Sequence, residues 1–347
     1  MVVAGSNMSQ PEGEEMTTTD RTTLPSRMRT AATDVLGIRY PIVQGGLARI
    51  ARAELAAAVS EAGGLGQIAV AGLAEPDLLR AQIRRARQLT KAPIGVNFPV
   101  GHMQLEHLVD LAAEEGVEAV SFTGGNPKSY IAQLENTPVR ILVLVSGPEQ
   151  AKKAEQAGAH VLATVGYEGG GHIGRSDLTT LVAIPLVCEA VSIPVLAGGG
   201  IANGFGLAAA LALGADGVEV GTRFIAVREA YAHQNYKEAV VQSGVDSTVV
   251  IKRSIGTPGR ALSNDWTTRI LDVERNGAGK EVVLGLVRAD ANERATDGGD
   301  MVNSVAWLGQ STALIRDIPG ASEVVERMVA EAIQASRRLA KCCDDAC

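Results

Sequence analysis

The stretch PVLAGGGIANGFGLAAALALGADGVEVGT, residues Pro194–Thr222, holds one complete strand–helix–strand unit. A short apolar run, Val195–Ala197, leads into three glycines, and a helix-like run rich in alanine and leucine follows at Gly204–Leu213. Gly214 suits the left-handed position just after a helix, and it precedes a second apolar run, Gly217–Val220. Short apolar strands that alternate with helices are typical of a parallel sheet, so this stretch predicts a βαβ unit.

The same alternation extends outward from this unit, beginning at Tyr40. The expected strands are Ile42–Val43, Leu65–Val70, Ile94–Asn97, Ala119–Phe122, Ile141–Val145, Val161–Val165, Val195–Ala197 and Gly217–Val220. The clearest further helices are Ala53–Ala62, Pro76–Thr90 and Pro148–Ala157. Eight parallel strands are the number that closes a (β/α)₈ TIM barrel. The alternative, an open doubly wound sheet, carries G-x-G-x-x-G after its first strand, whereas here the run is Gln44-Gly45-Gly46-Leu47-Ala48, which favours the barrel.

The alternation stops after Arg228, and the sequence predicts five segments. They are a polar, disordered leader over residues 1–28, the barrel over 29–228, a smaller lobe over 229–312, a C-terminal helix over 313–341 that returns to the barrel, and a tail over 342–347. The lobe is expected to be mostly helical, with a helix in Tyr231–Ser243, one strand in Ser247–Lys252 and a charged stretch of poor periodicity in Val273–Asp300. The final amphipathic helix is expected at Ser322–Lys341.

Composition narrows the class of function. The 347-residue chain is 46% hydrophobic and 20% charged, with 39 glycines and a net charge of −7. That charge argues against nucleic acid or an anionic membrane as a partner. No run approaches the roughly 18 apolar residues of a membrane span. Three of the four cysteines, Cys342, Cys343 and Cys347, lie close together in the tail, and Cys188 lies alone. We therefore expect neither a disulfide framework nor a metal site. This favours a cytoplasmic location.

Loops after the expected strands are rich in glycine and small polar residues, and in barrel enzymes these loops carry the active site. The loops after the seventh and eighth strands are the usual phosphate site of the fold, so Gly198–Gly200 and Glu219–Thr222 predict one phosphate cradle. Tight turns without a ligand are the alternative reading of each loop. His172, in the glycine-rich loop after the sixth strand, is the candidate acid or base.

Other chemistries find less support. Glu168, four residues before His172, is a candidate to orient it. His160 is expected to be structural, whereas His102 and His107 are five residues apart and share no helix face. No G-x-S-x-G elbow indicates a hydrolase triad, and none of the eight strands ends in a lysine suited to a Schiff base.

Several motifs, in order, resemble the 2-nitropropane dioxygenase family, which contains nitronate monooxygenases, FMN-dependent enoyl-acyl carrier protein reductases and NAD(P)H:quinone reductases. The matching segments are Pro41–Gly46 (PIVQGG), Ala56–Gly66 (AAAVSEAGGLG), Gly95–Asn97, Gly170–His172, Ala197–Ala202 (AGGGIA) and Gly217–Phe224 (GVEVGTRF). The resemblance covers about Arg29 to Asn264 and implies an FMN barrel covered by a helical lobe. It implies that His172 is catalytic. The residues it places at the cofactor are Gln44, Gly45, Asn97, Gly170, Gly199, Gly200, Glu219, Val220, Gly221 and Thr222.

The resemblance leaves the reaction open. Oxidation of alkyl nitronates by O₂, with His172 as the base, is one hypothesis. The other is NAD(P)H-dependent reduction of an enoyl thioester or quinone, and it is favoured by Val165, where many nitronate monooxygenases have glutamine, and by Ile173. A flavin-binding protein without turnover is a third class. In each case the partners are small molecules, and a homodimer is left open.

Overall fold

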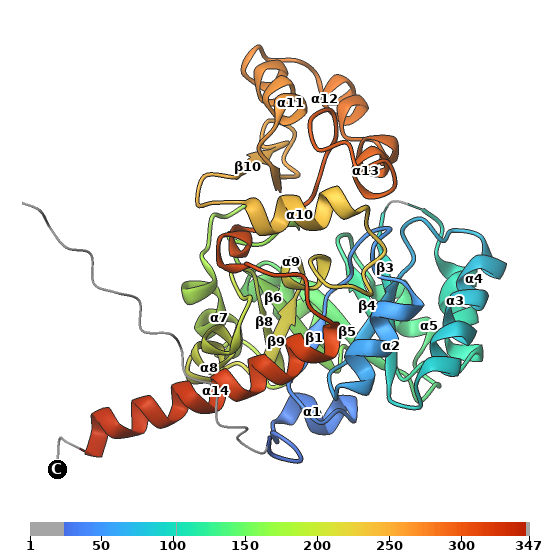
Figure 1. Ribbon diagram of the computed structural model, residues 1–347. Coiled ribbons are helices and arrows are strands. Elements are labelled where there is room, and N and C mark those ends of the chain that lie inside the picture. The colour runs from blue at the N-terminus through green and yellow to red at the C-terminus, as the bar shows by residue number, and fades with distance from the viewer. Residues whose placement is uncertain (1–23, 102, 345–347) are drawn as a thin grey trace, which may run out of the picture.

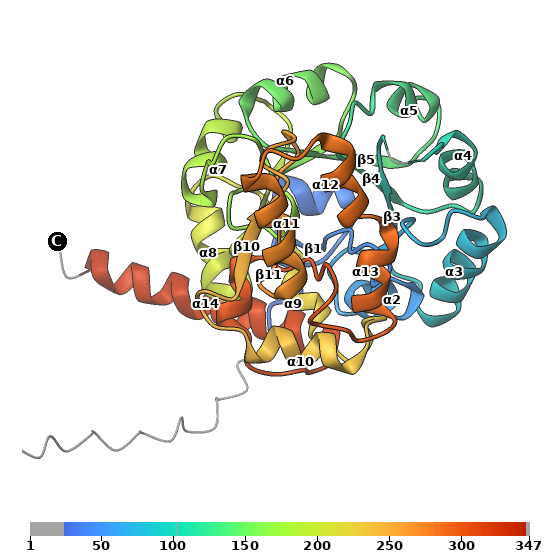
Figure 2. The same ribbon diagram turned by 90° about the horizontal axis from the view of Figure 1, so that it is seen from above.

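Eight parallel strands form the centre of the molecule, which the computed structural model describes over residues 24–101 and 103–344. Their order around the sheet is β1-β9-β8-β6-β5-β4-β3-β2, and a parallel bridge between Val43 and Leu65 joins the two outer strands, β1 and β2. The sheet therefore closes into the predicted barrel (Figure 2). The strands are β1 (Ile42–Gln44), β2 (Gly66–Ala69), β3 (Ile94–Pro99), β4 (Ala119–Thr123), β5 (Arg140–Val145), β6 (Val161–Val165), β8 (Val195–Gly198) and β9 (Gly217–Val220).

Helices surround the barrel, as Figure 2 shows. They are α2 (Ala53–Glu61), α3 (Pro76–Leu89), α4 (Glu106–Glu114), α5 (Lys128–Gln133), α6 (Pro148–Gln156), α7 (Thr180–Cys188) and α8 (Gly204–Ala212). A further helix, α1 (Ala31–Leu36), lies under the amino ends of the strands (Figure 1). The strands and helices predicted for the barrel are confirmed, and their ends differ from the predictions by at most two residues.

The barrel interior is apolar in its lower half. Val43, Leu65, Leu142 and Leu196 are fully buried there, and Leu36 of α1 belongs to the same cluster. These side chains alternate with residues that face the helices, because neighbouring residues of a strand point to opposite faces. Buried polar side chains, among them Gln67 of β2 and Ser121 of β4, lie farther along the strands, toward the end of the barrel where the loops rich in glycine begin.

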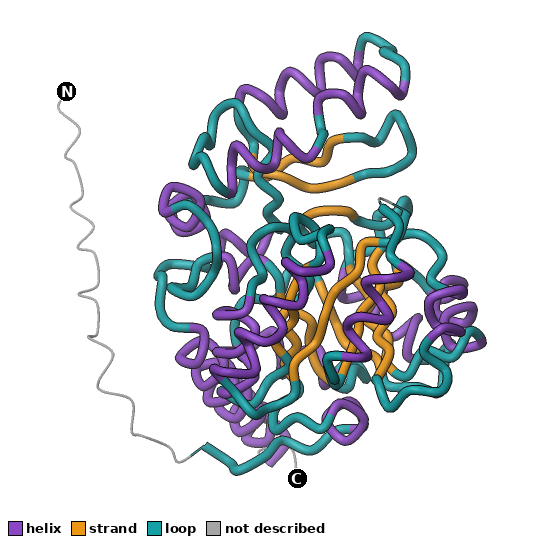
Figure 3. Tube along the Cα trace, turned by 90° about the vertical axis from the view of Figure 1, so that its right-hand side faces the viewer, coloured by secondary structure: helices purple, strands orange, loops and turns teal. Residues whose placement is uncertain are grey.

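A lobe lies above the carboxyl ends of the strands (Figures 1 and 3). Its elements are α9 (Thr222–Ile225), α10 (Gln234–Gln242), β10 (Thr248–Ile251), β11 (Gly259–Leu262), α11 (Asp265–Arg275), α12 (Lys280–Leu286), α13 (Ala289–Thr296) and the 3₁₀ helix η1 (Gln310–Leu314). Strands β10 and β11 form a second, three-stranded sheet with β7 (Gly171–His172). The charged stretch without clear periodicity consists of the end of α11 and two short helices, and each short helix buries few apolar side chains, such as Val283 of α12.

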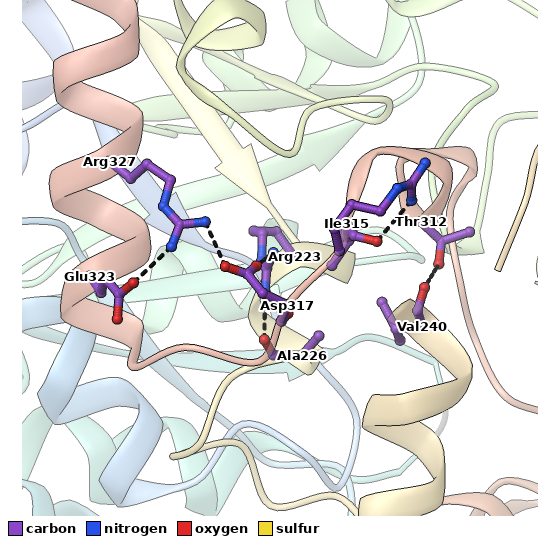
Figure 4. Close-up of polar contacts among 9 residues, drawn as sticks. Arg223, Ala226, Val240, Thr312, Ile315, Asp317, Glu323 and Arg327 are labelled. Atoms are coloured by element: carbon purple, nitrogen blue, oxygen red, sulfur yellow. Dashed lines mark hydrogen bonds and ion pairs between the residues drawn. The ribbon is translucent and has the colours of Figure 1, made fainter. Parts of the chain in front are cut away.

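The chain returns to the barrel in α14 (Ala321–Asp344), which packs beside α8 and α2. A buried arginine anchors the segment that leads into this helix (Figure 4). Arg223 of α9 donates from Nη1 to Asp317 Oδ1 at 2.9 Å and from Nη2 to the Asp317 carbonyl at 2.7 Å, and it also donates to the Ala226 carbonyl. Arg327 of α14 donates to the other Asp317 oxygen at 2.7 Å and to Glu323 at 2.7 Å. This network ties α14 to the turn that follows β9.

The two ends of the chain differ from the sequence expectation in detail. Residues 1–23 of the predicted leader lie outside the described residues, whereas Leu24 and Met28 pack against the barrel core. The Tyr40 hydroxyl donates to the Pro25 carbonyl at 2.9 Å. At the other end, α14 continues past the predicted Lys341 to Asp344. In the described part of the chain no helix is both long and apolar enough to span a membrane.

Candidate active site

The parallel register brings the predicted cofactor residues to one end of the barrel. Gln44 pairs with Val220 and Val43 with Glu219, so the ends of β1 and β9 lie side by side. Asn97 lies at the same level in β3. The glycines after β8 and β9 follow directly from their strands. Most of the predicted cofactor residues therefore lie together at the carboxyl end of the barrel, which we call the mouth. They are Gln44, Gly45, Asn97, Gly199, Gly200, Glu219, Val220, Gly221 and Thr222.

Backbone donors gather on one side of this mouth. Gly199 and Gly200 have φ angles of 91° and 74°, which glycine adopts without strain. Within the described residues, the N–H groups of Gly199, Gly200 and Gly221 donate no hydrogen bond. Unpartnered backbone donors from neighbouring loops suit a phosphate, which accepts several hydrogen bonds. The buried Thr222 hydroxyl beside them accepts a bond from Gly309 N at 3.0 Å.

The opposite side of the mouth has buried amides. Asn97 donates from Nδ2 to Ser121 Oγ at 2.8 Å, and both side chains are buried. A Cβ on Gly46 would lie 2.1 Å from Asn97 Cγ, so only glycine lets the β1 loop pass over this amide. The loop and Asn97 thus form a closely packed platform at the barrel rim.

Side-chain amides also join the seam between β1 and β2. Gln44 Oε1 accepts from Gln67 N at 2.9 Å, and Gln67 Nε2 donates to the Gln44 carbonyl at 2.9 Å. These bonds extend the bridge that closes the barrel, where Gln44 N donates to the Leu65 carbonyl and Leu65 N donates to the Ile42 carbonyl. The buried Gln44 side chain is therefore occupied in the barrel wall, and its neighbour Gly45 leaves backbone at the mouth.

Glu219 is the buried acid of the mouth. It is 6% exposed, and burial raises the pKa of its carboxyl to about 7, while a bond with Gln67 opposes the rise. Oε1 of both side chains, Glu219 and Gln67, lacks a hydrogen-bond partner among the described residues. Buried polar atoms without partners are uncommon in folded proteins. Their presence beside the mouth fits a flat polar group such as a flavin, as do the free glycine N–H groups.

His172 lies above the mouth in the lobe's sheet. It pairs with Gly259 of β11, and its side chain is exposed. Its Nε2 atom lies 2.8 Å from Nζ of Lys252, and its ring centroid lies 5.7 Å from that of Trp307. Lys252 Nζ lies 5.2 Å from the same indole, within the range of a cation–π contact. The three side chains form a cluster drawn from β7, the end of β10 and the segment after α13.

Lys252 is a buried lysine with a left-handed backbone conformation and a lowered pKa. It is 3% exposed, and its φ of 64° is left-handed, which costs a non-glycine residue about 1–2 kcal/mol. Burial lowers its pKa to about 8, and the charge of Glu274 partly offsets that effect. Lysines whose charge state changes near neutral pH are common at active sites.

Lys252 and Trp307 were not among the predicted site residues. A Schiff-base lysine is expected at the end of a barrel strand, whereas Lys252 follows β10 in the lobe. A lysine directly after the apolar run Thr248–Ile251 was the available signal. The sequence offered no comparable signal for Trp307.

Other predicted residues have structural partners. A Cβ on Gly170 would lie 2.5 Å from Gly309 N, so this glycine lets the 308–309 segment pack closely. Glu168 accepts from both N and Oγ1 of Thr180 at the start of α7, so its carboxylate caps a helix, whereas Nε2 of His172 contacts Lys252.

The remaining histidines lie elsewhere. His160 Nδ1 accepts from Ile141 N at 3.1 Å, and burial lowers its pKa, with Arg140 adding to the effect. His233 caps α10 by accepting from Asn235 N. His102 is outside the described residues. Among the described residues, no group of histidine, cysteine or acidic side chains could hold a metal ion.

One cavity reaches the edge of the barrel mouth, and another lies at the opposite end of the barrel. One of about 180 Å³ lies between α7 and α8 and reaches Glu168, Gly199 and Gly200. Another of about 390 Å³ lies at the amino end of the strands, beside Ile38 and Gly64, and touches no predicted site residue. The chemistry-bearing side chains lie at the opposite end, so we assign the larger cavity no part in the reaction.

Known proteins resemble this chain over most of its length. A sequence model of the nitronate monooxygenase family matches residues 29–105 and 101–331. The chain is 32% identical to a probable nitronate monooxygenase of Staphylococcus saprophyticus, across 90% of this chain and 100% of that protein. It is 30% identical to a (3aS,4S,5R,7aS)-5-hydroxy-7a-methyl-1-oxo-octahydro-1H-indene-4-carboxyl-CoA dehydrogenase of Rhodococcus jostii, across 89% and 97%.

A solved structure agrees with these matches. FabK from Thermotoga maritima is similar with a TM-score of 0.86 at 37% identity, covering 90% of this chain and 99% of that one. The family model covers both the barrel and the lobe, and the resemblance seen in the sequence motifs is confirmed. The chain belongs to the nitronate monooxygenase family and is an oxidoreductase.

Proposed function

We propose that this protein is an FMN-dependent nitronate monooxygenase that oxidises alkyl nitronates with O₂, with His172 as its catalytic base. The observation that carries the proposal is the His172–Lys252 pair above the barrel mouth, 2.8 Å between nitrogens. A base next to a cation suits a substrate that is an anion or becomes one, and a nitronate is such an anion. The family to which the chain belongs supports this choice.

Different residues of the mouth would bind different parts of FMN. The N–H groups of Gly199, Gly200 and Gly221 would hold the phosphate, with the Thr222 hydroxyl nearby. Asn97 and the backbone of Gly45 would contact the ring, and Glu219 is the buried acid next to Gly45. Bound there, FMN supplies the redox chemistry that transfers electrons between substrate and O₂.

His172 and the lobe handle the substrate. His172 takes the α-proton of a nitroalkane or binds the nitronate already formed, and Lys252, whose amine contacts the ring of His172, attracts the negative charge of the nitronate when it is protonated. Trp307, half-buried beside both, offers an apolar surface for the alkyl chain. The lobe lies above the mouth (Figure 1), where it would cover a bound substrate.

A second candidate is NAD(P)H-dependent reduction of an enoyl thioester or quinone. Val165 and Ile173 favour it, and so does the similarity to FabK, which at 37% identity is higher than that to the two curated relatives above. The relative from Rhodococcus jostii is named as a dehydrogenase of a carboxyl-CoA compound, which also indicates a thioester. In this reaction His172 donates a proton or polarises a carbonyl.

Anaerobic stopped-flow absorbance distinguishes the two reactions. The FMN-loaded protein is mixed separately with NADH, NADPH and propyl-2-nitronate. A flavin absorbance change with the nitronate alone, followed by O₂ consumption when air is admitted, is the expected result. Rapid bleaching by a nicotinamide would replace the proposal with the reductase, and enoyl thioesters and quinones would then be assayed as substrates. A protein that binds no FMN would overturn both.

A cytoplasmic location belongs to the same proposal. It rests on the crowding of three cysteines in the C-terminal tail and on the absence of a disulfide framework from the sequence pattern.

A further inference from the structure

The contact between His172 and Lys252 constrains where protons can lie. Nitrogen atoms 2.8 Å apart are at hydrogen-bond distance, so one proton lies between Nζ and Nε2. An ammonium group has no lone pair, and neither does an imidazolium ring. At least one of the two groups must therefore be neutral whenever the contact is made.

The surroundings hold Lys252 in this contact. Its backbone N donates to Glu274 Oε2 at 2.8 Å, and its ammonium faces the Trp307 ring. A Cβ on Gly259 would lie 3.3 Å from Lys252 Cε and 3.0 Å from the Trp307 ring, so glycine at this place leaves room for the lysine chain. With 3% of its surface exposed, Lys252 is shielded from solvent in this contact.

The other charged groups near this pair have partners of their own. Glu274 of α11 also accepts from N and Oγ of Ser254, and its charge favours the ammonium form of Lys252. Arg260 of β11 donates to the Tyr167 carbonyl and to Thr248. Arg253 pairs with Asp177. His172 is thus the titratable group whose ring nitrogen contacts the Lys252 amine.

We propose that Lys252 is the proton partner of His172, a positioning residue whose charge state selects whether the imidazole takes a proton from the substrate or gives one. The proposal rests on the function proposed above in so far as it gives His172 the proton transfer. It adds a residue, outside the motifs that carry the family resemblance, that governs the direction of this transfer.

The two directions need opposite forms of Lys252. As a free amine, Lys252 accepts Nε2–H, so the other ring nitrogen can take the proton of a nitroalkane C–H bond while the electron pair stays on the substrate. As an ammonium, Lys252 donates to Nε2, so the other ring nitrogen carries the proton that is given to a substrate anion; the Lys252 proton then moves to Nε2, which leaves a neutral imidazole and a neutral amine. Because burial lowers the pKa of Lys252 to about 8, both forms are available near neutral pH.

The two reactions should depend on pH in opposite directions. Turnover of a neutral nitroalkane should rise as the pH passes through about 8, since the free amine forms there. Reduction of an enoyl thioester should instead fall through the same range. In either reaction, Lys252→Met should remove this limb of the profile and lower kcat by about 10- to 100-fold. Lys252→Arg keeps a cation and should leave a reduced rate without the limb, because arginine stays protonated.

A measurement independent of turnover tests the pair itself. The ring nitrogens of ¹⁵N-histidine-labelled protein are followed by NMR as pH is varied, with the His172 signal assigned from its loss in His172→Ala. In Lys252→Met the midpoint of the His172 titration should rise by about one pH unit, because a neighbouring cation is gone. Lys237→Met is the matched control, since Lys237 is also a buried lysine but donates to the Arg228 carbonyl away from His172.

The outcomes separate this inference from the proposed function. Identical His172 titrations in the wild type, Lys252→Met and Lys252→Arg would overturn the pair, even if His172→Ala were inactive and the proposed function stood. A shifted titration together with full activity of His172→Ala would leave the pair intact as a contact but remove its role in the reaction and the function with it. Lys252→Arg also serves as the informative variant if Lys252→Met does not fold.

Discussion

His172 reaches the barrel mouth from a strand of two residues, and its ring is set between a lysine and an indole. An imidazole changes charge near neutral pH, so small changes around it alter its form. Glu219, below the rim, is a second group that titrates near neutral pH, because burial opposes its charge. Glu219 therefore couples the stability of the protein to pH, and His172 is the residue to which we assign the proton transfer.

Replacing His172 by alanine should leave the yellow flavin bound and lower turnover by about 10²-fold or more, the usual effect of removing a general acid or base. The absorbance spectrum measures the flavin, and steady-state assays with propyl-2-nitronate, a nitroalkane and NAD(P)H measure turnover. His107→Ala, on the exposed side of α4, is the control and should retain activity. Full activity of His172→Ala would contradict the role assigned to this residue.

Glu219→Gln should change how stability depends on pH. The folded-state pKa of about 7 lies above the ordinary 4.5, so the protonated form is favoured by folding. The stability it contributes is complete below 4.5 and is lost as pH rises through 7. Urea unfolding between about pH 5 and pH 8 should show Glu219→Gln gaining roughly 3 kcal/mol on the wild type. The exposed Glu135→Gln should show no such trend. If the unfolding free energies of Glu219→Gln and the wild type depended on pH in the same way, burial would not raise the pKa of Glu219.

At the scale of elements, the strands and helices could be predicted from local sequence patterns, whereas the pairing of distant segments could not. Strands such as Val161–Val165 and Gly217–Val220 were predicted with their observed ends, because apolar runs between glycine turns identify buried parallel strands. The loop that holds His172 was predicted on the correct face of the barrel. That it forms β7 and pairs with β11 was not predictable, since Gly171 and His172 have no strand pattern of their own.

The same limit explains the residues that were missed. Lys252 lies 80 residues from His172 along the chain, and nothing in either local sequence indicates the other. Glu168 was near His172 in sequence, but its carboxylate turns to Thr180 at the start of α7. The cofactor loops follow from the order of the barrel strands, whereas the groups around His172 depend on how the lobe folds back over them.

Gly259→Ala tests the packing of β11 against this cluster. The added methyl group would lie 3.0 Å from the Trp307 ring and 3.1 Å from the Gly171 carbonyl, so the neighbours must move. We expect a loss of about 1–3 kcal/mol in stability and a drop of roughly 10-fold or more in kcat, because small displacements of catalytic groups slow reactions. Thermal unfolding and steady-state kinetics measure the two effects. Gly244→Ala, where a methyl group meets open space, should be silent, and an equally silent Gly259→Ala would refute the tight fit.

At the scale of the whole molecule, barrel, lobe and C-terminal helix meet around β9 and α9. Thr222 accepts from Gly309, and the next residue, Arg223, anchors Asp317 before α14 (Figure 4). The predicted C-terminal helix is observed, and its amphipathic pattern explains its place, with Val325, Met328 and Val329 buried. The Arg223–Asp317 ion pair, which fixes the segment before this helix, joins residues 94 positions apart and so could not be anticipated.

Asp317→Asn should destabilise the protein by about 1–3 kcal/mol, because the Arg223 guanidinium, 5% exposed, would lose its counter-charge while Asp317 is partly exposed. Urea denaturation gives the change in unfolding free energy. Asp272→Asn removes an exposed pair with Arg275 and should stay within about 0.5 kcal/mol of the wild type. Equal values for the two variants would show that the network contributes no more than a surface pair.

The second sheet contains one strand, β7, that leaves the barrel wall and two, β10 and β11, that belong to the lobe. His172 pairs with β11 of the lobe, whereas the predicted cofactor loops follow β8 and β9 of the barrel. A displacement of the lobe that admits a substrate would therefore pull on the strand that carries His172 and would separate this residue from those loops. The return of the lobe would bring them together again, so access to the mouth and assembly of the site would be coupled through this small sheet.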